Sequence, residues 1–121
     1  MKIKLGIIGF GGMGKWHAEN APRAGVEIAA VCDIEEEKQQ DALKKGYKLY
    51  TTADKEVNTV ILTVPNYLHK EMCIKAAKAG KNVITEKPAA MNVQELDEME
   101  AACKEAGVFF TAHQNRRWDR D

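Results

Sequence analysis

Three glycines near the N-terminus have the spacing needed to bring a backbone close to a phosphate group. Gly9, Gly11 and Gly14 follow an apolar run and precede a helix-like segment, in the order G-x-G-x-x-G. In this motif the first glycine permits a tight turn, the second lets the backbone approach a pyrophosphate, and the third lets the helix pack closely on the strand. The N-terminus of the helix then offers unpaired N–H groups to phosphate. A plain turn is the alternative interpretation of the glycines taken alone.

Asp33 adds a second element of a dinucleotide site. It lies about 20 residues beyond the last glycine, where an acid accepts hydrogen bonds from the adenosine ribose hydroxyls. A carboxylate there repels a 2′-phosphate, and the next residues, Ile34 and Glu35, supply no arginine, so NAD is favoured over NADP. Asp33 could also be the N-cap of the next helix, with Glu36 completing a capping box, and the two roles are compatible.

Lys87, in the sequence E-K-P, could carry acid–base chemistry. Beside a nicotinamide it would be partly desolvated and close to a cationic ring, and both effects lower a lysine pKa. Oxidation of an alcohol sends a hydride to the nicotinamide and needs a group that takes the hydroxyl proton. Lys87 could take that proton or hold the hydroxyl, and the alternative is a solvated surface lysine.

The three histidines have no metal-ligand spacing. His17 is expected to pack or hydrogen-bond within the first helix. His69 lies one turn into the helix that follows T-V-P-N, so it could face a ligand crevice or away from it. We expect no metal site.

Apolar runs alternate with helical patterns along the chain. Strands are predicted at 2–9, 26–32, 47–50, 58–64, 81–86 and 108–113. Helices are predicted between them, at 34–45 and 66–79 and after a capping box formed by Asn92 and Glu95; Pro22 is expected to end the first helix near Ala21. This alternation of strands and helices predicts an α/β fold, a Rossmann-type doubly wound parallel sheet of about six strands with helices on both faces.

The two kinds of junction between these elements differ in chemistry. Helix-to-strand junctions carry glycines suited to a left-handed helix cap, namely Gly25, Gly46, Gly80 and Gly107. Strand-to-helix junctions carry polar or conformationally special residues, at 9–14, 33, 63–66, 86–88 and 113–115. Because ligands of open parallel sheets bind outside the carboxyl ends of the strands, this asymmetry predicts a binding crevice there.

Composition narrows the class of protein. The 121 residues suit one domain, and Lys plus Arg, like Asp plus Glu, number 18, so we expect neither nucleic acid nor an anionic membrane as partner. Three cysteines without a C-x-x-C pair indicate reduced structural thiols. Glycines interrupt the apolar N-terminus, and no apolar run approaches about 20 residues, so a cytoplasmic domain is expected.

Four stretches together resemble the N-terminal domain of the Gfo/Idh/MocA oxidoreductases. They are G-I-I-G-F-G-G-M-G-K-W-H-A, V-C-D-I-E-E-E-K, the long run from T-V-P-N-Y-L-H to V-I-T-E-K-P-A-A, and Q-N-R-R-W-D. The resemblance covers essentially the whole chain. It implies an NAD-dependent dehydrogenase acting on a sugar, polyol or related hydroxyl compound. The alternative is a stand-alone nucleotide- or CoA-binding module without catalysis.

The resemblance also implies roles for individual residues. The pyrophosphate would be cradled by Gly9, Phe10, Gly11, Gly12, Met13 and Gly14, and Asp33 would hold the adenosine ribose. The nicotinamide half would be lined by Thr63, Val64, Pro65, Asn66 and His69. Glu86 would contact the nicotinamide ribose, Lys87 would be the active-site lysine, and Gln114 and Asn115 would lie near the nicotinamide.

One departure from the family concerns length. Members carry a second α+β domain that supplies most of the substrate pocket and usually the oligomer interface, whereas this sequence ends at Asp121. We therefore expect residues 1–121 to be the cofactor domain of a longer, homo-oligomeric protein, inactive or nearly so by itself.

Overall fold

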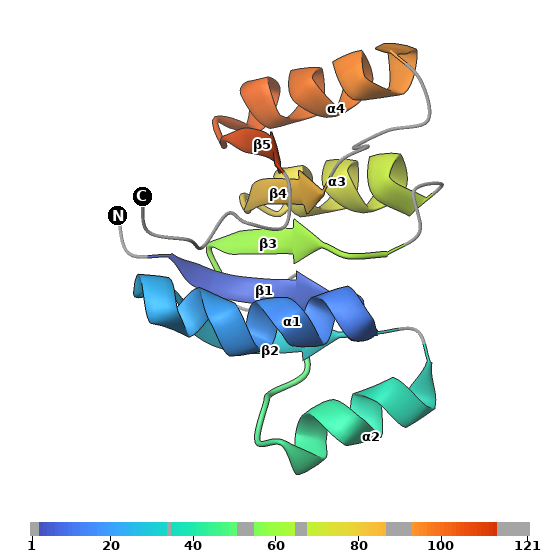
Figure 1. The fold of residues 1–121 in the computed structure, drawn as a ribbon. Helices are drawn as coiled ribbons and strands as arrows, with labels where there is room; N and C mark the ends of the chain where they lie inside the picture. Colours follow the sequence, from blue (N-terminus) through green and yellow to red (C-terminus); the bar gives the residue numbers. More distant parts are fainter. Residues whose placement is uncertain (1–2, 34, 51–54, 65–67, 87–92, 114–121) are drawn as a thin grey trace.

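The structure is a computed structural model that describes residues 3–33, 35–50, 55–64, 68–86 and 93–113. Strands and helices alternate along the chain, as the sequence predicts (Figure 1). The elements are β1 (Lys4–Ile8), α1 (Gly12–Asn20), the 3-10 turn η1 (Ala21–Ala24), β2 (Glu27–Cys32), α2 (Glu36–Lys44), β3 (Thr59–Leu62), α3 (His69–Lys78), β4 (Asn82–Glu86), α4 (Val93–Ala106) and β5 (Phe110–His113).

The strands form one parallel sheet in the order β2-β1-β3-β4-β5. The first crossover runs from β1 to β2, and the chain then returns past β1 to β3 on its other side (Figure 1). The direction of winding therefore reverses between β1 and β3. In doubly wound sheets this switch point is where the ligand crevice opens.

The prediction of about six strands is wrong by one among the described residues. The segment 47–50 lies beside β2 but pairs with it at a single residue, in a parallel bridge between Val31 and Leu49. Two hydrogen bonds of 2.7 Å frame this bridge, from the Val31 N–H to the Lys48 carbonyl and from the Tyr50 N–H to the Val31 carbonyl. One register pair does not make a strand, so the segment only extends the edge of the sheet.

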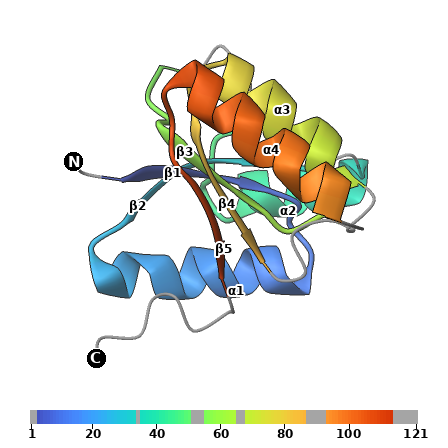
Figure 2. The same cartoon turned by 90° about the horizontal axis from the view of Figure 1, so that it is seen from above.

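Helices cover both faces of the sheet, and each face has its own buried core. On one face, Leu5 and Ile7 of β1 pack with Ala18 of α1 and Ala42 of α2. On the other, residues of β3 and β4 pack with Cys73, Ala76 and Ala77 of α3 and with Met99 and Cys103 of α4. Figure 2 shows α3 and α4 together on one side of the sheet, with α1 on the other. Burial on both faces explains why the strands read as nearly continuous apolar runs.

The predicted helix ends are confirmed where the structure describes them. α1 ends at Asn20, and Pro22 lies in the short turn η1 that follows. All four predicted cap glycines have a positive φ, from 74° to 90°. α2 and α3 lie within the predicted ranges. α4 begins at Val93, and the predicted cap Asn92 lies outside the described residues.

Candidate functional site

A cavity of about 250 Å³ opens at the switch point of the sheet. Its lining comes from the carboxyl end of β1 (Ile8, Gly9, Gly11), from β2 and the start of α2 (Cys32, Asp33, Glu35, Lys38), and from the β3–α3 segment (Thr63, Val64, Leu68, Met72). Three predicted site segments, far apart in the sequence, therefore meet at one end of the sheet.

Gly9 lies where the chain turns sharply out of β1. Its φ is +100°, and a Cβ atom there would lie 2.8 Å from the Thr63 carbonyl oxygen. The Gly9 N–H donates to the Cys32 carbonyl (2.7 Å), and the Thr63 hydroxyl donates to the Gly9 carbonyl (2.5 Å). β2 and β3 therefore fix the first residue of the loop from both sides, and only glycine fits between them.

The other two motif glycines differ in what surrounds them. A Cβ on Gly14 would lie 1.9 Å from the Gly9 carbonyl oxygen, so α1 packs directly on the turn. A Cβ on Gly11 would meet only the Lys38 ammonium, at 3.6 Å. The space over Gly11 is therefore left open toward the cavity, which is where the motif brings a diphosphate close to the backbone.

The start of α1 suits an anion. Its N-cap is Gly11, which supplies no side-chain cap, and its first turn contains no acidic residue. Gly12 is exposed and Met13 is half-buried. No carboxylate of α1 itself therefore neutralises its first N–H groups or the positive end of its helix dipole, and both are available to an anion. The residues present fit a dinucleotide diphosphate.

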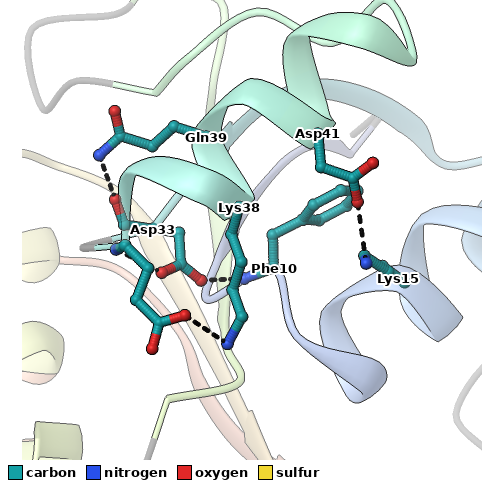
Figure 3. Close-up of polar contacts among 7 residues, drawn as sticks. Phe10, Lys15, Asp33, Lys38, Gln39 and Asp41 are labelled. Carbon is teal, nitrogen blue, oxygen red and sulfur yellow. Dashed lines mark hydrogen bonds and ion pairs between the residues drawn. The ribbon is translucent and has the colours of Figure 1, made fainter.

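Asp33 connects the glycine loop to the turn before α2 (Figure 3). Its Oδ2 accepts the Phe10 N–H at 2.7 Å, and its Oδ1 accepts the Glu35 N–H at 2.8 Å. The N-cap of α2 is Glu35, so the interpretation of Asp33 as the N-cap is wrong; the carboxylate closes the preceding turn instead. Each carboxylate oxygen has further acceptor capacity, so ribose hydroxyls can still bind.

Phe10 contributes its backbone to this network and its ring to the core. The ring is 1% exposed and packs edge-on against Tyr47, with centroids 5.8 Å apart. The ammonium groups of Lys15 and Lys45 each lie 5.7 Å from the ring centroid. Asp41 of α2 pairs with Lys15 of α1 at 2.8 Å (Figure 3). These contacts hold α1, α2 and the glycine loop together, and sequence reasoning did not anticipate them.

Sequence reasoning also missed Lys38. It lines the cavity, and its ammonium pairs with the Glu35 carboxylate at 3.0 Å. The hydrogen bond from Lys38 to Glu35, with the charges of Glu35, Asp33 and Glu37, raises the pKa of Lys38. A lysine three residues beyond Glu35, one helical turn into α2, was the available signal, because i,i+3 pairs share a helix face.

His69 and His17 are both buried. His69 is 2% exposed, and its Nε2 donates to the Val64 carbonyl at 2.9 Å. It does not line the cavity but fixes Val64, which does. His17 is fully buried and contacts Trp16 edge-on, with ring centroids 5.1 Å apart, which confirms that it packs within α1.

The remaining predicted residues are only partly described. Parallel register aligns Ile8 with Leu62 and Leu62 with Thr85, so the residues that follow leave the sheet at the same edge. The backbone of Glu86 ends β4 there and pairs with that of His113. Outside the described residues lie Pro65, Asn66, Lys87, Gln114 and Asn115.

The cysteines are free thiols, as predicted. The Cys73 and Cys103 sulfur atoms lie 3.8 Å apart between α3 and α4, and burial raises the pKa of both. Within the described ranges no group of three or more His, Cys, Asp or Glu side chains could hold a metal ion. No described helix combines the length and apolar character that crossing a bilayer requires.

Residues 3–114 match the model of the Gfo/Idh/MocA oxidoreductase family, described as having an NAD-binding Rossmann fold. The chain belongs to this family. The five-stranded doubly wound sheet agrees with that fold, and the glycine loop and Asp33 occupy its switch point.

Two curated relatives and one solved structure illustrate the match. Over 91 residues the chain is 45% identical to 2,7-anhydro-N-acetylneuraminate hydratase of Mediterraneibacter gnavus, covering 75% of this chain and 22% of that protein. It is 33% identical to myo-inositol 2-dehydrogenase of Thermotoga maritima, over 98% of this chain and 38% of that protein. A crystal structure of an NAD-binding protein from Listeria innocua superposes with a TM-score of 0.88 at 39% identity, over 98% of this chain and 37% of that chain. The chain thus spans well under half the length of these relatives.

Proposed function

We propose that residues 1–121 are the cofactor-binding domain of an NAD-dependent oxidoreductase that moves a hydride between the nicotinamide and a hydroxyl or carbonyl carbon of a sugar or polyol. The observation that carries the proposal is the cavity at the switch point, where Gly9, Gly11 and Asp33 meet. The likeness to a myo-inositol dehydrogenase supports the substrate class. The substrate pocket and a homo-oligomer interface are assigned, in this proposal, to a second domain.

The described residues bind and orient the cofactor in this proposal. The Gly9–Gly14 loop and the first N–H groups of α1 hold the diphosphate. Asp33 accepts the adenosine ribose hydroxyls while its bonds to Phe10 and Glu35 fix its orientation. Thr63 holds the loop closed through the Gly9 carbonyl. His69 holds Val64 against the cavity.

The chemical step is proposed to depend on Lys87. NAD held by the glycine loop and Asp33 would supply the acceptor for the hydride of the carbinol carbon. The Lys87 amine takes the proton of the same hydroxyl group, so the alcohol becomes a carbonyl compound and the amine becomes an ammonium. Lys87 directly follows Glu86, whose backbone ends β4 at the edge where the cavity opens.

NAD is preferred over NADP in this proposal because two carboxylates border the ribose position. Asp33 and Glu35 both line the cavity, and each would repel a 2′-phosphate. Neutral Asn in place of Asp33 keeps the side-chain shape but presents only one acceptor oxygen. Asp33→Asn should therefore weaken NADH binding and narrow the difference between NADH and NADPH.

Titration of the 121-residue chain with NADH and NADPH tests the binding part of the proposal through cofactor fluorescence. Enhanced fluorescence with NADH at lower concentration than with NADPH supports it. Equal affinity contradicts the preference for NAD, and binding of neither contradicts the cofactor function. In a protein that includes the second domain, Lys87→Ala should abolish turnover and retain NADH affinity. Unchanged turnover would remove Lys87 from the mechanism, and absence of any turnover in the unsubstituted protein would favour a nucleotide-binding module.

A further inference from the structure

Two buried thiols face each other between α3 and α4. The Sγ atoms of Cys73 and Cys103 lie 3.8 Å apart, and the two residues are 0% and 1% exposed. Sulfur atoms at this distance are in contact, whereas a disulfide bond holds them at about 2 Å. A shift of about 2 Å in the relative position of the two sulfur atoms would therefore close a bond between the helices.

The packing of α3 on α4 holds the two thiols together. Figure 2 shows the two helices side by side on one face of the sheet. About one turn before Cys73, the Lys70 ammonium of α3 pairs with the Glu98 carboxylate of α4 at 2.5 Å. Met99, one turn before Cys103, is buried in the same core cluster as both thiols. The thiols therefore meet because the helices pack in this register, although 30 positions of the chain separate them.

A small reagent would reach Cys103 before Cys73. A groove of about 570 Å³ beside α4 and the start of β5 is lined by Cys103 and not by Cys73. Its other described lining residues are Leu96, Glu100, Lys104, Val108 and Phe110. The Cys103 side chain thus borders an open groove, while the Cys73 side chain is enclosed in the core.

The electrostatics of the pair favour the same order of reaction. Burial raises the pKa of both thiols, so each ionises less readily than a free cysteine. The hydrogen bond between them raises the pKa of Cys73 further and opposes the rise at Cys103, because a donating Cys73 thiol stabilises the Cys103 thiolate. The thiolate is the form that attacks an oxidant, and it forms more readily on Cys103 than on Cys73.

We propose that Cys73 and Cys103 form an oxidisable dithiol that a peroxide closes into a disulfide between α3 and α4, with Cys103 as the attacking thiol. The Cys103 sulfur attacks one peroxide oxygen, the O–O bond breaks, and the thiol proton leaves with the released hydroxide as water, so that Cys103 becomes a sulfenic acid. The Cys73 sulfur then attacks the Cys103 sulfur, the S–O bond breaks, and the Cys73 proton leaves with the hydroxyl group as a second water. Two thiols are oxidised by two electrons, and one hydrogen peroxide is reduced to two waters.

Peptide mapping of the oxidised protein tests the proposal. The folded 121-residue chain is treated with hydrogen peroxide, then unfolded with an alkylating reagent and analysed by mass spectrometry. We expect the loss of two hydrogen atoms and one linked pair of peptides, containing Cys73 and Cys103, which dithiothreitol separates. Cys32→Ala is the matched control, because Cys32 is the third cysteine and lines the cofactor cavity instead, so this variant should form the same link.

Thermal unfolding provides a second readout. The oxidised chain should melt about 5 to 10 °C above the reduced chain, because a bond between residues 30 positions apart restricts the unfolded state. Cys73→Ala and Cys103→Ala should show no such rise after the same treatment.

The same two variants test the order of reaction. In folded Cys73→Ala, dimedone should trap a sulfenic acid at Cys103. In folded Cys103→Ala, Cys73 should be trapped at least about tenfold more slowly, because it borders no groove and ionises less readily. Should either variant fail to fold, the peptide map of the unsubstituted chain still decides whether the disulfide forms.

Two results would overturn the inference. One is a folded, unsubstituted chain in which Cys73 and Cys103 both remain open to alkylation after a treatment that fully oxidises a small thiol in the same solution. The other is trapping at Cys73 as fast as at Cys103, which would contradict the role of Cys103 as the attacking thiol. Neither readout uses NADH, so the inference can fail while the proposed function holds, and the reverse.

Discussion

The glycines at the two edges of the sheet meet different physical requirements. At the carboxyl edge, a side chain on Gly9 or Gly14 would collide with backbone, at 2.8 Å and 1.9 Å. At the amino edge, the four cap glycines have only a positive φ, and a Cβ on any of them would meet nothing within 4 Å. The cap glycines are needed for backbone conformation alone, whereas Gly14, and Gly9 in addition to its own positive φ, are needed because they lack a side chain. A substitution at each position should reveal which requirement applies.

Gly14→Ala should have the largest effect. The added methyl group would overlap the Gly9 carbonyl oxygen, and neither backbone segment can yield without moving α1 from β1. We expect a loss of about 3 kcal/mol in the free energy of unfolding, together with loss of NADH binding. Urea unfolding and NADH fluorescence measure the two effects.

Gly12→Ala is the control for stability. Gly12 lies in the same helix as Gly14, but a Cβ there would meet nothing within 4 Å. Its stability should be unchanged or higher by up to about 1 kcal/mol. A Gly14→Ala variant as stable as Gly12→Ala would mean that α1 does not need its close approach to the Gly9 turn.

Gly11→Ala should separate binding from folding. Gly11 has a φ of −82°, which alanine adopts without strain, and the added methyl group would meet only the flexible end of Lys38. The free energy of unfolding should change by less than about 0.5 kcal/mol. NADH affinity should fall by about tenfold or more, because the methyl group fills the space left for the diphosphate. Normal NADH binding by this variant would contradict the placement of the diphosphate over Gly11.

The sequence predicted the local geometry of the candidate site where that geometry depends on short spacing patterns. The glycine motif, Asp33 and the cap glycines each follow from a short pattern, and the resulting geometry at Gly9 and Gly14 agrees with their expected roles. The number of strands was harder to predict, since the apolar residues of 47–50 signal burial as strongly as a strand does. Tyr50 is indeed buried, although only Leu49 of this segment pairs with β2.

The contacts that the sequence did not predict join segments distant in the chain or depend on side-chain direction. The Thr63 hydroxyl reaches Gly9 across 54 positions, and the pair of Asp41 with Lys15 requires α1 and α2 on the same face. Lys38 lies in the charged first turn of α2, and this run of charges in the sequence indicates a solvent-exposed helix. Only the direction of α2 relative to the glycine loop brings its ammonium to the cavity.

Gly80→Ala should have a moderate effect on stability and none on binding. Gly80 follows α3 with a φ of +80° and donates its N–H to the Ala77 carbonyl at 2.9 Å. Alanine in this conformation costs about 1 kcal/mol. Gly80→Asn should lose less, because asparagine tolerates the left-handed region better. Thermal unfolding measures the order, and equal losses for Ala and Asn would indicate a steric rather than a conformational requirement.

Asp41→Asn should have the smallest effect and tests whether the α1–α2 contact belongs to the fold or to the site. The hydrogen bond from Lys15 lowers the pKa of Asp41 below its ordinary value, so the ionised carboxylate stabilises the fold above about pH 4, and this contribution is lost as the pH falls through the lowered pKa. The variant should melt slightly below the unsubstituted chain at pH 7, and the gap should close in acid and in high salt. NADH affinity should change less than about twofold, because Asp41 does not line the cavity. A loss of affinity as large as that of Gly11→Ala would mean that Asp41 and Lys15 position the glycine loop through the Phe10 ring. The requirement for exact packing would then extend from the loop glycines to the surface of α2.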